Sequence, residues 1–332
     1  MKKILLTLLA LLSILDAQCA KRIEDFSGTK VCIPQQIDSI IITCYGGASQ
    51  EVALFDADKK IVALPDSSSF AHFIKVYPLL QNTPSVGTFD DVNLETLLKH
   101  KPSIVFVGAT SYPTNKKIAD SGIPTFTLGI GKHTIPTLLD EFIKVGELLG
   151  SQKKALQLVK YWQKHLADIE QKLSHIKDKK VLFYTSSRST NDIYNWNDEF
   201  ISAIGALNMV KVASIDGEIT LETLLQHNPD AILTTTNGTS ALSYGNLKKS
   251  TLFPHLKAVQ NSLLLEAPVG SFWWDRPSPE AILGIMWVAK KLYPNELASL
   301  DIQKESEYFF KEFYNYNLSR SEYLSFFNKE NL

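Results

Sequence analysis

The chain has 332 residues, which is enough for about two domains of ordinary size. Apolar residues make up 45% and charged residues 21% of the sequence, as in globular proteins with a substantial core. The formal net charge is −1, so the charge balance gives no indication of a broad basic surface of the kind that binds nucleic acid.

The first twenty residues have the three-part pattern of a secretory signal peptide. A basic start, "MKK", precedes the apolar run "ILLTLLALLSIL" and the short segment "DAQCA". The run is too short to span a bilayer comfortably, and no later stretch is long and apolar enough. We expect cleavage after Cys19 or Ala20. Lipid attachment at Cys19 is a less favoured alternative, because Asp16 and Gln18 are poor neighbours for a lipoprotein site.

Removal of residues 1–20 leaves two cysteines, Cys32 and Cys44. In an oxidising compartment they either form a disulfide or remain two buried thiols, and both alternatives stay open. Two cysteines cannot by themselves build a cysteine-only metal or iron–sulfur site.

Seven apolar, β-branched runs predict strands, and helical patterns separate them. Continuous apolar strands of this kind favour parallel sheets that are covered on both faces. The predicted strands are 39–43, 60–64, 103–107, 125–129, 180–185, 231–236 and 263–267.

One phrase occurs twice, as "LETLLKHKP" from Leu94 and as "LETLLQHNP" from Leu221, 127 positions apart. Each copy predicts a helix that ends before proline and leads into an apolar strand. The repeat therefore indicates two similar α/β units.

A long helix is predicted between the two copies. Gly150 is a typical residue for the end of one helix, and Ser151 can cap the start of the next. Apolar residues then recur at steps of three and four over 151–176. A second helix is predicted in "RPSPEAILGIMWVAKKLYP", with Ser278 as its cap and Pro279 in its first turn. The domains expected are a signal peptide (1–20), an N-terminal lobe (21–150), a connecting helix (151–176) and a C-terminal lobe (177–332).

The sequence resembles the periplasmic substrate-binding proteins of ABC importers for iron–siderophores, haem and vitamin B12. The resemblance covers nearly the whole mature chain, and three segments carry it: "VGTFDDVNLETLLKHKPSIVFVG", "SAIGALNMV" and "WWDRPSPEAILGIMWVAKKLYP". It implies an α/β fold of two Rossmann-like lobes with parallel sheets, joined by a single long α-helix, with a ligand cleft between the lobes. It also implies a periplasmic monomer that carries a metal chelate to an inner-membrane permease with a separate ATPase subunit.

In this family a glutamate on each lobe docks into arginines of the permease. The glutamates at the matching positions here are Glu95 in "NLETLLKHKP" and Glu222 in "TLETLLQHNP". Charge complementarity of this kind fixes register and speeds encounter. The alternative role of such a glutamate is to satisfy the dipole of its own helix.

Ligand-contacting residues are expected just after strand ends, where ligands bind in open α/β sheets. Aromatic walls suit planar or catecholate-like ligands, and arginine suits oxyanions. The candidate ligand-binding residues are Tyr45, His72, Tyr112, Arg188, Trp196, Trp274 and Arg276. No intrinsic cofactor and no bare metal site are expected, although His72 remains a candidate ligand to a chelated metal.

The cargo itself stays open at this stage. An iron–siderophore or related metal chelate is favoured, and the alternatives are a nickel or cobalt chelate, haem, cobalamin and an oxyanion such as molybdate. An enzyme is not expected, because neither a phosphate-binding P-loop nor a G-x-S-x-G elbow is present. The rival from another class is an exported hydrolase built from Asp66, neighbouring serines and His72.

Overall fold

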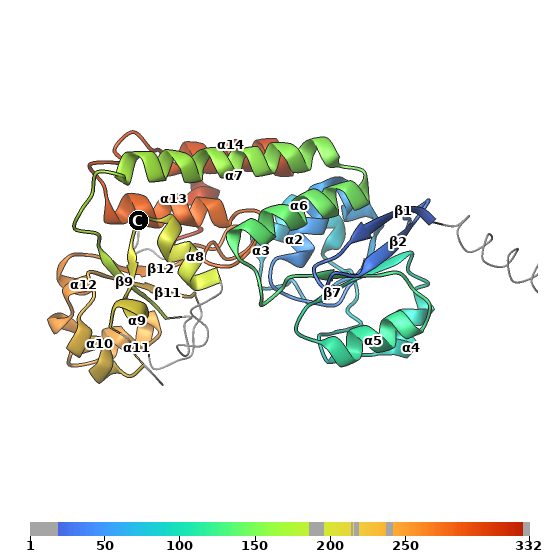
Figure 1. The fold of residues 1–332 in the computed structure, drawn as a ribbon, viewed down its shortest axis with the longest axis horizontal. Helices are drawn as coiled ribbons and strands as arrows, with labels where there is room; N and C mark the ends of the chain where they lie inside the picture. Colours follow the sequence, from blue (N-terminus) through green and yellow to red (C-terminus); the bar gives the residue numbers. More distant parts are fainter. Residues whose placement is uncertain (1–18, 186–195, 214, 216–218, 237–241, 328–332) are drawn as a thin grey trace, which may run out of the picture. The chain divides into compact units, whose positions relative to one another are not determined.

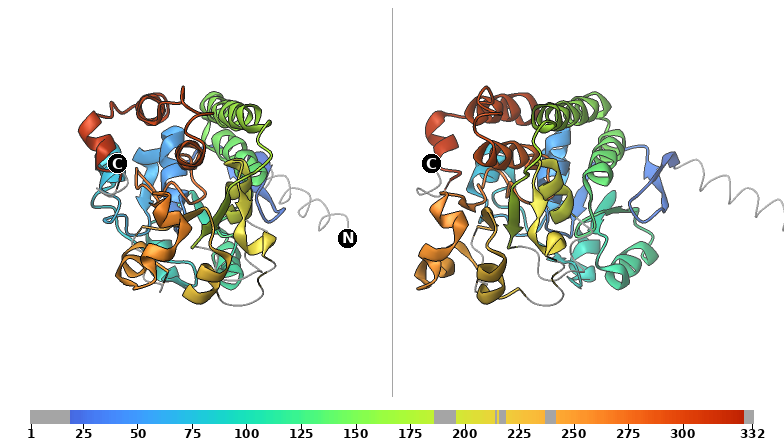
Figure 2. Two further views of the ribbon diagram at one scale, coloured as in Figure 1. Left: turned by 90° about the vertical axis from the view of Figure 1, so that its left-hand side faces the viewer. Right: turned by 60° about the vertical axis from the view of Figure 1, so that its left-hand side comes forward.

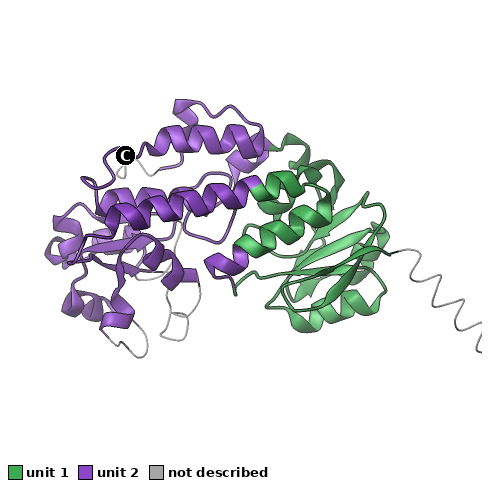
Figure 3. Cartoon of the chain, turned by 45° about the horizontal axis from the view of Figure 1, so that its top comes forward, with its two compact units in different colours: residues 1–69, 77–132, 139–156 green, residues 70–76, 133–138, 157–332 purple. Residues whose placement is uncertain are grey.

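The computed structural model describes residues 19–185, 196–213, 215, 219–236 and 242–327. The chain divides into two compact units, which Figure 3 colours separately. Unit 1 comprises residues 1–69, 77–132 and 139–156, and unit 2 comprises residues 70–76, 133–138 and 157–332. Each unit contains a parallel sheet with helices, which confirms the predicted pair of α/β lobes.

The sheet of unit 1 has four parallel strands in the order β4-β3-β7-β8. Helices cover both faces, with α4 and α5 on one of them (Figure 1). Two antiparallel hairpins, β1-β2 and β5-β6, are also present. The bounds are β1 Cys19–Glu24, β2 Lys30–Pro34, β3 Ile40–Ile42, β4 Ile61–Ala63, β5 Gly87–Thr88, β6 Asp91–Val92, β7 Ile104–Gly108 and β8 Thr125–Leu128.

The sheet of unit 2 also has four parallel strands, in the order β10-β9-β11-β12. The bounds are β9 Val181–Tyr184, β10 Leu207–Asn208, β11 Ala231–Thr234 and β12 Leu264–Glu266. All seven predicted strands are therefore present. The short strand β10 at the sheet edge, like the two hairpins of unit 1, was not predicted.

Most helices are short, and the longest, α7, has 22 residues. Within the described ranges, none combines the length and the apolar character that a membrane crossing needs. The helices of the first half are α2 Ala48–Val52, α3 Ala71–Val76, α4 Leu94–Lys99, α5 Tyr112–Asp120, α6 Ile135–Leu149 and α7 Gln152–Leu173. The later ones are α8 Trp196–Ala203, α9 Met209–Val212, α10 Leu221–His227, α11 Tyr244–Lys249, α12 Lys257–Gln260, α13 Ala281–Leu292, α14 Ile302–Tyr314 and α15 Arg320–Leu324.

Helix α7 carries the predicted apolar stripe, and in unit 2 it packs beside α14 (Figures 1 and 2). Its Trp162 is fully buried, and the indole N–H donates to the carbonyl oxygen of Pro279 at 3.0 Å. Tyr161 donates its hydroxyl to Glu305 of α14 at 3.0 Å. The first bond ties α7 to the segment before α13, and the second ties it to α14.

The start of α13 differs from the prediction. Glu280, not Ser278, is the residue at the N-cap position, and the Ser278 hydroxyl has no hydrogen-bond partner. The segment from Ser278 to Glu280 is buried. Glu280 instead directs its carboxyl group into the core, where several donors converge on it.

The two copies of the repeat form α4 and α10. Each helix begins with a side-chain cap, since Asn93 accepts from the Thr96 N–H at 2.9 Å and Thr220 accepts from the Thr223 N–H at 3.3 Å. Just beyond each helix the residue before the proline has a left-handed backbone, with φ of 48° at Lys101 and 37° at Asn228. The repeat therefore extends from sequence to backbone conformation.

Of the two alternatives for Cys32 and Cys44, the bridge between them is wrong, and only Cys44 is a buried thiol. Cys32 on β2 forms a disulfide with Cys19 on the paired strand β1, with a Cα–Cα distance of 5.4 Å. Cys44 follows β3, is fully buried and is a free thiol. Pairing of neighbouring strands therefore decides the partner, and the expected cleavage after Cys19 or Ala20 would remove that partner.

Candidate functional site

Aromatic side chains gather at the carboxyl edge of the sheet in unit 1. Tyr45 follows β3 and Tyr112 follows the adjacent parallel strand β7, so both belong to the same edge. Tyr45 is 42% exposed and Tyr112 is 73% exposed. Phe89, from the β5-β6 turn, has its ring centroid 6.3 Å from that of Tyr45. Large aromatics that remain open to solvent at a strand edge are typical of a binding surface.

Close backbone approaches hold this edge together. Phe89 adopts a positive φ of 50°, and its N–H donates to the Thr43 carbonyl oxygen at 2.7 Å. A Cβ on Gly108, the last residue of β7, would lie 3.0 Å from Phe89 Cε1 and 3.1 Å from Cys44 Cβ. Glycine at position 108 therefore lets the Phe89 ring lie against the strand end.

Two buried carboxyl groups lie beneath this edge. Glu51 of α2 and Glu141 of α6 interact, and Glu141 accepts from the Gly129 N–H, just after β8, at 2.7 Å. Burial, with Glu141 close by, raises the pKa of Glu51 well above its usual value. Burial also raises the pKa of the Cys44 thiol, which keeps it protonated and unreactive.

In unit 2 a network surrounds Asp275, in the loop after β12. The Tyr184 hydroxyl donates to Asp275 Oδ2 at 2.7 Å, and the Trp196 indole N–H donates to the Asp275 carbonyl oxygen at 2.8 Å. Arg276 Nε lies 3.8 Å from Asp275 Oδ2. Asp275 is completely buried, whereas the Arg276 side chain keeps 37% of its exposure. The network thus fixes the loop that presents Arg276.

The structure corrects the prediction that Trp274 contacts a ligand. Its side chain has no exposed surface, and its indole N–H donates to Glu280 Oε2 at 2.9 Å. Phe326 and Phe327 pack edge-on against its ring. Trp274 is therefore a core residue of unit 2 and does not present its ring to a ligand. Trp196 is nearly as buried, and its bond to Asp275 makes it a support for the loop.

His72 lies in the segment 70–76, which belongs to unit 2 although the segments on either side of it belong to unit 1. Its Nε2 lies 3.0 Å from the Ser325 hydroxyl, and its ring packs edge-on against Phe326 at 4.7 Å. Burial lowers the pKa of His72. Asp66, the other member of the hydrolase alternative, accepts from the Ser68 N–H at 2.9 Å. Arg188 lies outside the described residues.

The two glutamates of the repeat are exposed on their helices. Glu95 is 81% exposed and forms an ion pair with Lys99, one turn along α4, at 2.7 Å. At Glu222, its own backbone N–H and the Thr220 hydroxyl stabilise the carboxylate and lower its pKa. Gln226 takes the place of Lys99 in the second copy. The charge of Glu222 is therefore the less neutralised of the two.

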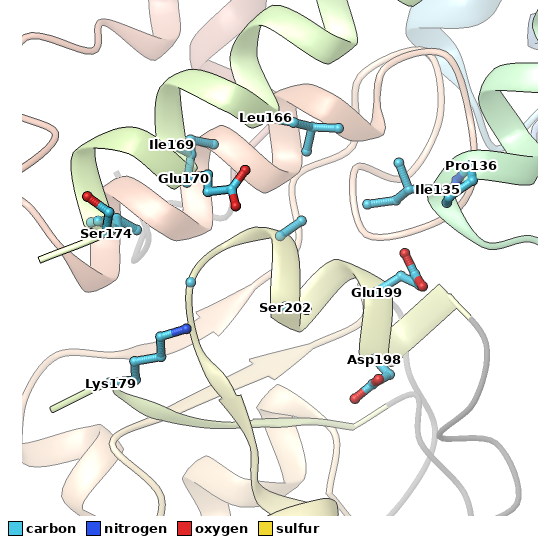
Figure 4. A pocket seen from close by; sticks show the side chains of 13 residues that line it. Ile135, Pro136, Leu166, Ile169, Glu170, Ser174, Lys179, Asp198, Glu199 and Ser202 are labelled. Carbon is cyan, nitrogen blue, oxygen red and sulfur yellow. The ribbon is translucent and has the colours of Figure 1, made fainter. Parts of the chain in front are cut away.

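A trough of about 570 Å³ lies within unit 2 between α7, α8 and the first residues of α6 (Figure 4). Ile169 and Leu173 of α7 give it an apolar wall, and Glu170 and Glu199 add acidic groups. None of the predicted ligand residues that the structure describes lines it. In the described part of the chain no three His, Cys, Asp or Glu side chains are grouped to hold a metal ion.

Sequence reasoning missed Phe89 and Tyr184, whereas the pairing of Arg276 with Asp275 is an alternative that their adjacency in the sequence already offers. Tyr184 carries a recognisable signal, since it lies near the end of a predicted strand. Phe89 carries none, because its place depends on a turn with positive φ.

Comparison with known proteins gives consistent matches. The family model described as periplasmic binding protein matches residues 46–268. The molybdate-binding protein MolA of Haemophilus influenzae is 26% identical over 322 residues, which cover 88% of this chain and 90% of MolA. An iron-uptake system-binding protein of Bacillus subtilis is 26% identical over 292 residues, covering 78% of this chain and 89% of that protein.

A solved structure with the same fold is a periplasmic solute binding protein from Veillonella parvula. Its TM-score is 0.79 at 24% identity, and the match covers 94% of this chain and 98% of that one.

Proposed function

Because the chain belongs to the periplasmic binding protein family, we propose that it captures an anionic metal chelate and delivers it to an ABC permease. In this proposal the chelate is an iron–siderophore or a related small complex. The protein supplies a binding surface and no covalent chemistry. The metal arrives inside its chelator and is cargo.

The exposure of Tyr45 and Tyr112 carries the proposal. Two tyrosines at one strand edge offer ring faces to a planar chelator and hydroxyl groups to its oxygens. A bare oxyanion needs donors but no aromatic wall, so this surface favours the larger ligand. Phe89 extends the aromatic surface beside Tyr45.

Arg276 is the proposed anion-binding group of unit 2. A guanidinium group is always charged and matches carboxylates and other oxyanions with paired donors. Asp275 on one side limits its rotation, and the bonds from Tyr184 and Trp196 keep Asp275 in place. In this role Trp196 and Asp275 are positioning residues for Arg276.

Molybdate or a similar oxyanion is the second candidate cargo. The similarity to the molybdate-binding protein favours it, since that match runs along 88% of this chain. Arg276 would serve this ligand too, whereas Tyr45 and Tyr112 would contribute little.

Glu95 and Glu222 are the proposed contacts with the permease. Both are exposed in the first turn of repeat-equivalent helices, so each unit offers one carboxylate. Arginines on the permease would bind these glutamates with an affinity that falls as the salt concentration rises.

Native mass spectrometry of the exported protein against a panel tests the cargo. The panel contains ferric citrate, a ferric catecholate, haem, cobalamin and molybdate. We expect a ferric chelate to bind, and Tyr45→Ala and Tyr112→Ala each to weaken it about tenfold or more, which is about 1.4 kcal/mol. Tyr308→Ala, which removes an exposed tyrosine of α14, is the matched control. Binding of molybdate alone, unchanged in both tyrosine variants, would establish the second candidate instead.

A double-mutant cycle tests whether Tyr45 and Tyr112 contact the same bound molecule. If they do, the free-energy losses of Tyr45→Ala and Tyr112→Ala will differ from additivity by at least about 0.5 kcal/mol. Strict additivity would assign them to separate roles.

A further inference from the structure

The N-terminal strand carries information about how the exported protein is processed. Cys19 is the first residue of β1, and its sulfur is bonded to Cys32 on β2. Two modifications compete for this sulfur, because a thioether to a lipid and a disulfide each occupy the one valence that a thiol provides. A Cys19 that is cross-linked to Cys32 therefore carries no lipid.

The strand that begins at Cys19 is an integral part of unit 1. It pairs with β2 from the Cys19↔Pro34 position to the Glu24↔Lys30 position. Ile23 is only 5% exposed, and Lys21 forms an ion pair with Glu147 of α6 at 3.6 Å. Cleavage after Ala20 would make Lys21 the first residue and remove the start of this ladder.

The turn after β1 is tied to the central sheet. Asp25 is buried, and its Oδ1 accepts from the backbone N–H groups of Ser27 at 2.9 Å and Thr29 at 3.0 Å. Its Oδ2 accepts from the Thr127 N–H, in β8, at 3.0 Å. The hairpin is therefore held at its turn by Asp25 and at its open end by the disulfide.

We propose that the mature protein retains Cys19 as a structural disulfide with Cys32, so that the leader is removed ahead of Cys19 and Cys19 is not a lipid anchor. Ala17 is the nearest small residue before Cys19 and suits the last position of a leader, which predicts Gln18 as the mature N-terminus. This placement replaces cleavage after Cys19 or Ala20. It does not depend on the identity of the cargo.

Formation of the bridge is an oxidation of two thiols. Cys19 and Cys32 together lose two protons and two electrons as their sulfur atoms join. A disulfide oxidant of the export compartment accepts both, and its own disulfide becomes a dithiol. The Cys44 thiol takes no part, because it is fully buried beyond a different strand.

The test uses the full chain, exported with its own leader. Peptide mapping should find an N-terminal peptide that begins ahead of Cys19 and is cross-linked to the peptide containing Cys32. Denatured but unreduced protein should accept one alkyl group, at Cys44, and reduced protein should accept three, one for each cysteine. In detergent phase separation the protein should remain in the aqueous phase.

Two variants make the labelling specific. Cys32→Ser frees the sulfur of Cys19, so the unreduced protein should accept two alkyl groups. Cys44→Ala is the matched control and should accept none before reduction and two afterwards. A chain that begins at Ala20 or Lys21, a lipid on Cys19, or alkylation of Cys19 without reduction would each overturn the proposal.

Discussion

The buried carboxyl group of Glu280 gives the protein a predictable dependence of stability on pH. Four groups donate to it: the Ser271 N–H and the Trp274 indole N–H to Oε2, and the Ser271 and Tyr314 hydroxyls to Oε1. Even so, burial raises its pKa from 4.5 to about 7. The change that tests this is Glu280→Gln.

The magnitude follows from the difference between the folded and unfolded pKa values. Because the folded pKa of Glu280 is higher, the native state binds more protons between pH 4.5 and 7. The stabilisation of the native state by protonation of Glu280 is complete below pH 4.5 and is lost as the pH rises through 7. The rise in the pKa of Glu280 from 4.5 to about 7 corresponds to roughly 3 kcal/mol of unfolding free energy.

Glutamine reproduces the hydrogen bonds of the protonated acid at this site. Its carbonyl oxygen takes the place of Oε2 and accepts from Ser271 and Trp274, while its amide donates to the two hydroxyl oxygens, which rotate to accept. Glu280→Gln should therefore be nearly neutral at pH 5 and stabilising by up to about 3 kcal/mol at pH 8.

Urea unfolding at pH 5, 6, 7 and 8, followed by tryptophan fluorescence, measures both proteins. Only the difference in unfolding free energy between the two proteins is assigned to Glu280, because other acids affect both proteins equally. Glu312→Gln, which changes an exposed acid of α14, should give a curve parallel to the unsubstituted protein. Parallel curves for Glu280→Gln as well would refute the assigned pKa.

Three further changes test the proposed binding and docking surfaces. Gly108→Ala should displace the Phe89 ring, since the new Cβ would lie 3.0 Å from it, and calorimetry should show weaker chelate binding with a stability loss below about 3 kcal/mol. Glu95→Ala should leave chelate affinity unchanged and impair uptake by cells, and an equal fall in affinity would contradict the docking role. Lys99→Gln should strengthen permease binding by no more than about twofold, because an exposed helical ion pair contributes about 0.3–0.5 kcal/mol.

The strands could be predicted from the sequence because each is a continuous apolar run. The runs that form β7 and β8 are buried at nearly every residue, whereas a helix on the surface would expose one face to solvent. The hairpin β1-β2 could not be predicted in this way. Its residues alternate in burial, and its first residues overlap a segment that a leader pattern also explains.

The orientation of side chains in "GSFWWDRPSPE" could not be predicted either. Phe272 and Trp274 point into the core and Trp273 is partly exposed, but composition alone does not distinguish them. The orientation of Trp274 is set by Glu280, which comes six residues later and accepts a hydrogen bond from the indole N–H. A buried acid was not expected at a helix start, so the aromatic that it fixes was assigned to the ligand.

The two copies of the repeat agree in backbone conformation but differ in the charge that surrounds Glu95 and Glu222. Its helices share caps and the left-handed residue before proline, so the backbone places Glu95 and Glu222 alike. Their charges differ in effect, because Lys99 compensates Glu95 whereas glutamine occupies the equivalent position near Glu222. A permease that reads both carboxylates would therefore meet a stronger anion at Glu222. In the proposed docking, the shared backbone conformation would set where the two carboxylates lie, and their unequal neighbours would give the two contacts different strengths.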